Sequence, residues 1–171
     1  MKALVTGGSE GIGFAIAAEA AKAGWEVEIW ARRQPKLRET LAKLNALRSG
    51  GAAPSSVSVD VGDAMSVRGA AERYITANGP PDRLFHCAGY AVAAFIDQVR
   101  EEDIDGMLKT NVAGAMHVAR GFGPSMAKRG SGAIVLTASD LGFIGLFGWS
   151  IYAATKHAVV GLTSSLRNEL R

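Results

Sequence analysis

Short apolar runs alternate with segments of helical periodicity along the whole chain. The apolar runs have the length and composition of buried strands, and they predict strands at residues 3–7, 26–31, 56–61, 83–89 and 132–138. Between them, apolar residues recur every three or four positions, which predicts helices over 12–23, 35–47, 64–78, 101–121 and 150–171. This alternation indicates βαβ units, and therefore an α/β fold with a doubly wound parallel sheet.

The segment boundaries carry ordinary stop and start signals. Gly24 is placed to end the first helix, and Asp63 is placed to cap the third. We find no linker and no internal repeat, so residues 1–171 are expected to form a single domain. No strand is predicted after 132–138, which leaves this apolar strand at a sheet edge. Such edges are normally covered, so either another chain pairs with it or the sequence is part of a longer protein.

Composition excludes several classes of function. The net charge of +3 is small and the basic residues form no long run, so we expect no nucleic-acid partner. One cysteine and three scattered histidines offer neither a disulfide nor metal-ligand spacing, so no metal is expected. No apolar run reaches the ~18 residues that a membrane span needs, and no leader is recognised. We therefore expect a cytoplasmic protein with no transmembrane segment.

A glycine-rich loop, TGGSEGIG at residues 6–13, joins the first strand to the first helix. Glycines at positions 7, 11 and 13 let the backbone turn sharply and approach a pyrophosphate, and the helix start near Ile12 offers free N–H groups. An ordinary turn is the alternative, but a strand before and a helix after favour a Rossmann-type dinucleotide site. We predict that its cofactor-binding residues are Gly7, Ser9, Gly11, Ile12 and Gly13.

The second strand ends in WARRQ, and this ending bears on the choice of dinucleotide. An NAD site usually has an acid here for the ribose 2′-hydroxyl, and none is present. Ala31 leaves space, and Arg32 and Arg33 offer guanidinium groups that suit a 2′-phosphate. We therefore predict NADP(H), with two solvated arginines as the alternative. After the third strand, Asp60 could accept from the adenine amino group or cap a turn, and Val61 follows it in the same predicted site.

The order of these motifs resembles that of the short-chain dehydrogenase/reductase family. The resemblance covers essentially the whole chain and rests on TGGSEGIG, CAG at 87–89, Asn111 in TNVAG, Ser139 and YAATK at 152–156. It implies that Ala88 and Gly89 also contact the cofactor. The family's NNAG is HCAG here, and its serine pair is Ala138-Ser139. Family members continue into further strands and a substrate-binding segment, which we expect this sequence to lack.

The resemblance also implies the chemistry. Tyr152 would donate a proton to the substrate oxygen as hydride arrives from the nicotinamide. Lys156 lies one helical turn on, where its charge favours phenolate and where it could also hold a cofactor ribose. Ser139 would hydrogen-bond the reacting oxygen, with a capping serine as the alternative. Asn111 interrupts an apolar row, so we expect it to be buried and to support a water relay, or else to bend its helix.

Two stretches, 142–162 and 58–61, resemble a branch of the family that reduces the long-chain lipid ketone 3-ketodihydrosphingosine with NADPH. Our hypothesis is an NADPH-dependent carbonyl reductase of a small-molecule ketone or alcohol. The alternatives are another substrate, such as a 3-oxoacyl thioester or a steroid-like alcohol, and a non-catalytic dinucleotide sensor. Apolar residues at 143–149 could line a substrate site or an interface. By family analogy we expect a homodimer or homotetramer.

Overall fold

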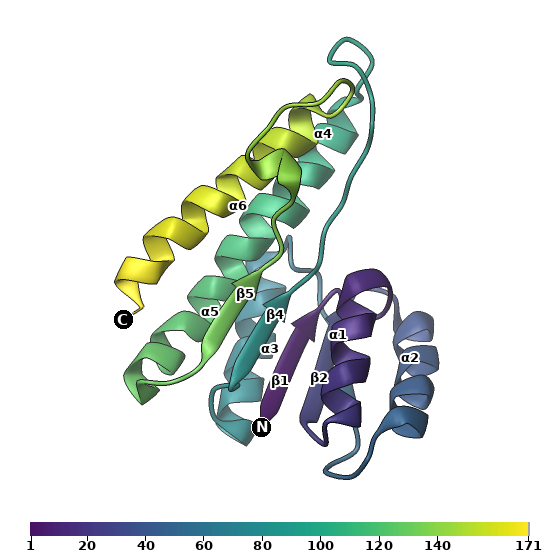
Figure 1. Ribbon diagram of the computed structural model, residues 1–171, viewed down its shortest axis with the longest axis vertical. Coiled ribbons are helices and arrows are strands. Elements are labelled where there is room, and N and C mark those ends of the chain that lie inside the picture. The colour runs from purple at the N-terminus through teal and green to yellow at the C-terminus, as the bar shows by residue number, and fades with distance from the viewer. Residues whose placement is uncertain (171) are drawn as a thin grey trace.

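A computed structural model describes residues 1–170, and within them the strands form one parallel sheet in the order β3-β2-β1-β4-β5 (Figure 1). The strands are β1 (Lys2–Thr6), β2 (Glu26–Ala31), β3 (Ser55–Ser58), β4 (Arg83–His86) and β5 (Ala133–Leu136). β1 lies between β2 and β4, and Thr6 at its end pairs with both Trp30 and His86. From β1 the chain adds β2 and β3 on one side of the sheet and then returns to add β4 and β5 on the other side. A crevice is expected at the carboxyl end of β1, where this direction reverses.

The helices cover both faces of the sheet, which confirms the doubly wound arrangement. They are α1 (Gly11–Lys22), α2 (Gln34–Leu47), α3 (Ala64–Asn78), α4 (Glu101–Met107), the π-helical η1 (Leu108–Ala113), α5 (Gly114–Arg129), the 3₁₀ turn η2 (Asp140–Gly142) and α6 (Ser150–Glu169). Alternate residues of β1 face opposite layers: Val5 packs with α1 and α2, and Leu4 packs with α3 and α5.

Several strand boundaries differ from the prediction. The third strand ends at Ser58 rather than at 61, and the fourth and fifth end at His86 and Leu136. In each case the next residue still donates one backbone hydrogen bond to the neighbouring strand, as Val59 N does to Ala31 O at 3.1 Å, and the chain then forms a loop at the carboxyl edge of the sheet. The edge position predicted for 132–138 is confirmed, because β5 pairs with β4 alone among the described strands.

The long helix was predicted to end at 121, which is wrong. It passes through the π-helical turn η1 and ends at Arg129, where Gly130 adopts a left-handed conformation with φ 72°. Glycines inside this helix allow close packing: a Cβ at Gly121 would lie 3.1 Å from the Ala71 Cβ of α3. Asp63 caps α3 as predicted, by accepting from Met65 N at 2.9 Å. The last helix was expected to reach 171, and Arg171 lies outside the described residues.

Candidate active site

A cavity of about 700 Å³ opens at the carboxyl ends of β1, β2 and β4, where the strand order predicts a ligand crevice. Its wall is made by the glycine loop, the end of β2, the turn after β3 and the loop after β4. The wall contains these predicted cofactor residues: Gly7, Ser9, Gly11, Ile12, Gly13, Arg32, Arg33, Asp60, Val61, Ala88 and Gly89. The fold therefore brings them together, and their contact with a cofactor stays a prediction.

The glycine loop leaves no room for side chains at two positions. A Cβ at Gly7 would lie 2.6 Å from Ala88 N, and one at Gly13 would lie 2.3 Å from the Gly7 carbonyl oxygen. The loop is also tied to α2, because Thr40 Oγ1 donates to the Ser9 carbonyl over 3.0 Å. No side chain caps the start of α1, so its first N–H groups have no capping partner. The residues of this first turn line the cavity. This arrangement fits an anionic group such as a pyrophosphate.

The two arginines after β2 are in different surroundings. Arg33 Nη2 lies 2.6 Å from Glu10 Oε1, an ion pair that the sequence did not indicate. Within residues 1–170, the Arg32 guanidinium has no hydrogen-bond or ion-pair partner. Asp60 Oδ1 accepts from Gly62 N at 2.9 Å, so it stabilises the turn while still lining the cavity. Both interpretations of Asp60 are therefore compatible with its position.

Tyr152 and Lys156 lie on one face of α6, as predicted. Lys156 is buried, its Nζ lies 5.5 Å from the centre of the Tyr152 ring, and it donates to the Thr137 carbonyl over 2.8 Å. Burial lowers the pKa of Lys156 below the usual value for lysine. Trp149 packs edge-on against Tyr152, with ring centres 5.5 Å apart. A buried cation is thus held beside a phenol by packing and by the backbone that follows β5.

Ser139 lies three residues beyond β5, at the start of η2. Its Oγ accepts from Leu141 N at 3.2 Å, so the capping alternative describes its position in this structure. Because Oγ accepts this bond, its own hydrogen remains available for donation to another oxygen. The turn packs closely on α6, since a Cβ at Gly142 would lie 3.0 Å from the Lys156 carbonyl oxygen. A role for Ser139 in catalysis stays a prediction.

Asn111 is buried, as predicted, and lies within η1. Its Nδ2 donates to the Tyr90 carbonyl at 2.8 Å and to Thr155 Oγ1 at 3.0 Å, and its Oδ1 accepts from Tyr90 N at 2.8 Å. Both amide hydrogens are therefore used in joining the loop after β4 to α6. The predicted water relay would need other atoms of this residue.

Replacement of Asn111 by alanine should lower the free energy of unfolding by about 2 kcal/mol, because the half-buried N–H and C=O groups of Tyr90 lose their partner. Urea denaturation followed by circular dichroism would measure the change. Asn168→Ala is the matched control, since Asn168 donates only to Ser164 O on the exposed end of α6. Equal stability of the Asn111 variant and the wild type would contradict this role.

Several residues of this region were missed from the sequence. The Tyr90 hydroxyl donates to buried Asp103, whose other oxygen accepts from Arg100 Nε at 2.7 Å. His86 is buried with its Nδ1 2.8 Å from Thr6 Oγ1, and burial together with the charge of Lys156 lowers its pKa to about 4. Thr6 and His86 are 80 positions apart and Tyr90 and Asp103 are 13 apart, so no local pattern predicts these two contacts. Arg100 and Asp103 are three positions apart, on the same helical turn.

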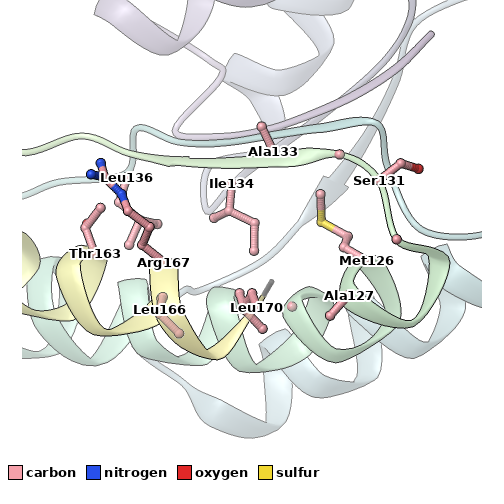
Figure 2. A pocket seen from close by; sticks show the side chains of 13 residues that line it. Met126, Ala127, Ser131, Ala133, Ile134, Leu136, Thr163, Leu166, Arg167 and Leu170 are labelled. Atoms are coloured by element: carbon pink, nitrogen blue, oxygen red, sulfur yellow. The ribbon is translucent and has the colours of Figure 1, made fainter.

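A second cavity, of about 470 Å³, lies along the uncovered edge of β5 (Figure 2). Figure 2 shows Ile134 of β5, Met126 of α5 and Leu170 beyond α6 lining the space between the strand and the two helices. None of the predicted site residues lines it. Among the described strands β5 has no neighbour on this side, so one wall of the cavity is the edge of the sheet.

The described residues meet neither the requirements of a metal site nor those of a membrane-spanning helix. Among residues 1–170, no three His, Cys, Asp or Glu side chains are grouped so that they could hold a metal ion. None of the described helices has both the length and the apolar composition of a membrane span.

Comparison with known proteins identifies the family. A family model for short chain dehydrogenases matches residues 1–171. The chain belongs to the short-chain dehydrogenase family. This membership confirms the resemblance found in the glycine loop and in the YAATK segment. The order of the parallel strands agrees with it as well.

Relatives within the family include ketone reductases. A 3-dehydrosphinganine reductase of Danio rerio is 31% identical over 98% of this chain and 51% of its own length. A 3-oxoacyl-(acyl-carrier-protein) reductase of Staphylococcus aureus is also 31% identical, over 98% of this chain and 68% of its length. The chain thus spans about half the length of the sphinganine reductase relative.

Solved structures share the fold closely. An actinorhodin polyketide ketoreductase crystallised with NADPH superposes with a TM-score of 0.91 and is 32% identical, covering 99% of this chain and 64% of its own. An alcohol dehydrogenase from Thermococcus sibiricus, complexed with 5-hydroxy-NADP, gives a TM-score of 0.89 at 25% identity, covering 98% of this chain and 70% of its own. The Rossmann-type fold predicted from the sequence is thereby confirmed.

Proposed function

We propose that this chain forms the cofactor-binding and proton-donating part of an NADP(H)-dependent carbonyl reductase. The observation that carries the proposal is the buried Lys156 ammonium beside the Tyr152 phenol. If the tyrosine and the lysine were only surface residues, the lysine would not need to be buried and bonded to a backbone carbonyl. A dinucleotide sensor without catalysis would have no use for this arrangement.

The cavity at the carboxyl ends of the strands is the proposed cofactor site. The glycine loop and the start of α1 would hold the pyrophosphate, and Arg32 would meet a 2′-phosphate. The NADPH-bound ketoreductase with the same fold supports this assignment. When bound, the reduced dinucleotide supplies hydride to the carbonyl carbon.

The chain's own residues would manage the proton. The Tyr152 O–H donates its proton to the carbonyl oxygen, which completes the alcohol and leaves a phenolate. The charge of Lys156 stabilises that phenolate, and the Ser139 hydroxyl, whose hydrogen is available, would donate to the same oxygen. Placing these donors on α6 and η2, which pack together, keeps their separation fixed.

The substrate side of the proposal favours an apolar ketone. The loop before α6 exposes Phe143 and Phe147, of which Phe147 is 88% exposed. The loop after β4 runs beside it, with Ala94 N donating to Gly148 O at 2.8 Å, and it exposes Phe95 and Ile96. A long-chain ketone such as 3-ketodihydrosphingosine suits such a rim, and the sphinganine reductase relatives support it.

A 3-oxoacyl thioester is the second candidate, favoured by equally similar 3-oxoacyl reductases. The test is to follow NADPH absorbance on adding 3-ketodihydrosphingosine or acetoacetyl-CoA to the chain. Consumption with the first and not the second would support the lipid ketone, and the reverse would support the thioester. Consumption with neither, by a chain that binds NADPH, would argue against reduction by this chain. A homodimer or homotetramer stays a prediction.

Replacement of Arg32 by alanine should weaken NADPH binding by about tenfold and leave NADH binding nearly unchanged, because only NADPH carries the 2′-phosphate. Titration of each dinucleotide by its own fluorescence would measure both constants. Arg38→Ala, a change of the same charge on the exposed face of α2, serves as the control. Equal losses for the two dinucleotides would remove the case for a 2′-phosphate site at Arg32.

A further inference from the structure

Glu10 places a negative charge at the mouth of the proposed dinucleotide site. It precedes Gly11 in the glycine loop, and its side chain is 62% exposed. It lines the cavity together with Arg32 and Arg33. A carboxylate at this point is unexpected in a site for a cofactor that is itself anionic, because like charges repel.

The charge of Glu10 is balanced by a single neighbour. Glu10 Oε1 lies 2.6 Å from Arg33 Nη2, which links the glycine loop to the end of β2. The Glu10–Arg33 pair therefore adds almost no net charge to the cavity. Arg32 remains as a guanidinium without a side-chain partner within the described residues. Of the two adjacent arginines, one is neutralised and one is available.

We propose that Glu10 limits the preference of this chain for NADPH over NADH, because it neutralises Arg33 and leaves Arg32 as the one cation that meets the 2′-phosphate. The inference rests on the proposed dinucleotide site. The alternative is that Glu10 holds Arg33 in place as a second phosphate ligand. The two possibilities predict opposite effects when Glu10 loses its charge.

An effect on binding rather than on folding is expected from the exposure of the pair. Both side chains are more than 60% exposed, and ion pairs in such surroundings contribute little to stability. A phosphate that carries nearly two negative charges interacts with Glu10 directly, and this repulsion does not depend on the fold. Loss of the pair should therefore change the Tm very little, whereas it should change the Kd of the dinucleotide.

Titration of the purified chain with NADPH, NADH and adenosine 2′,5′-bisphosphate would test the proposal. For Glu10→Gln we expect NADPH and the bisphosphate to bind about fivefold more tightly at low ionic strength, with NADH within about twofold of wild type. The gain should shrink in 0.5 M salt, where charges are screened beyond roughly 4 Å. Glu19→Gln is the matched control, because Glu19 pairs with Lys22 on α1 and does not line the cavity.

A double-variant cycle separates neutralisation from positioning. Arg33→Ala alone should weaken NADPH binding by roughly fivefold, because it leaves the Glu10 charge unbalanced. The combined Glu10→Gln and Arg33→Ala variant restores the net charge of the wild type, so its NADPH affinity should return to within about twofold. If Glu10 instead positions Arg33, the combined variant will bind NADPH as weakly as Arg33→Ala.

The outcomes distinguish this inference from the proposed function. Weaker or unchanged NADPH binding by Glu10→Gln, with wild-type binding intact, would overturn the role of Glu10 and leave the cofactor site standing. Absence of binding of all three probes by the folded wild type would overturn the cofactor site, and the role of Glu10 with it. Circular dichroism melts of every variant confirm that the fold is retained.

Discussion

Phenylalanine at position 152 should reduce turnover by roughly 10²–10⁴-fold while leaving NADPH affinity within about twofold, because the ring is kept and only the donated proton is removed. The ring still packs on Trp149 and still faces Lys156, so the surroundings of the site should not change. Single-turnover measurement of NADPH oxidation with a saturating ketone, together with a fluorescence titration of NADPH, would show both effects.

The control for this variant is Tyr74→Phe, since Tyr74 is a buried phenol of α3 that packs on Phe122. It should leave the rate constant for NADPH oxidation unchanged. Turnover that survives in Tyr152→Phe would show that another group supplies the proton. Loss of NADPH affinity along with turnover would instead indicate a cofactor-binding role for the Tyr152 hydroxyl.

Alanine at position 13 should lower the free energy of unfolding by about 3 kcal/mol and abolish measurable NADPH binding. Its Cβ would lie 2.3 Å from the Gly7 carbonyl oxygen and 2.7 Å from the Gly7 carbonyl carbon. These are backbone atoms and cannot rotate away, so the glycine loop or the start of α1 must move. Urea denaturation gives the stability, and a titration with NADPH gives the binding.

Gly161→Ala offers a matched control for the alanine at position 13. Gly161 lies in α6 with no atom within 4 Å of an added Cβ, so alanine there should stabilise the chain by up to about 1 kcal/mol. NADPH binding should be unchanged. If Gly13→Ala retains wild-type NADPH affinity, the close approach of α1 to the Gly7 backbone is not required for the cofactor site.

The layered architecture could be predicted because it depends on local patterns. β1 reads as apolar on both sides and is buried on both faces by helices, and α2 repeats leucine on the side that meets the sheet. The motifs at 6–13 and 152–156 were also readable, because the spacing of a few residues within one loop or one helical turn decides their geometry. The cavity then forms where the strand order places these loops together.

The contacts that hold the site together were less accessible to sequence reasoning. Glu10 and Arg33 are 23 positions apart, and Asn111 and Thr155 are 44 apart, so neither pair leaves a periodic signal. The long helix was predicted to end at 121, but it continues past the glycines at 121 and 123 to Arg129. These glycines accommodate side chains of α3 and Leu170, which is a property of packing and not of the local sequence.

The wide turn η1 has a geometric consequence for the loop after β4. Asp103, Met107, Asn111 and Ala115 are all buried, although they are spaced by four residues. In a regular α-helix each such step overshoots a full turn by about 40°, so the four would drift by about 120° around the axis. The extra residue per turn in η1 counteracts this drift.

Because this angular drift is corrected, the same helix contacts both the side chain and the backbone of Tyr90. Asp103 accepts from the phenol, and Asn111, eight positions on, pairs with the backbone N–H and C=O. A regular helix carrying the same residues would rotate one of these contacts away from Tyr90. The side wall of the cavity that Tyr90 provides therefore depends on the π-helical turn η1 in a different part of the chain.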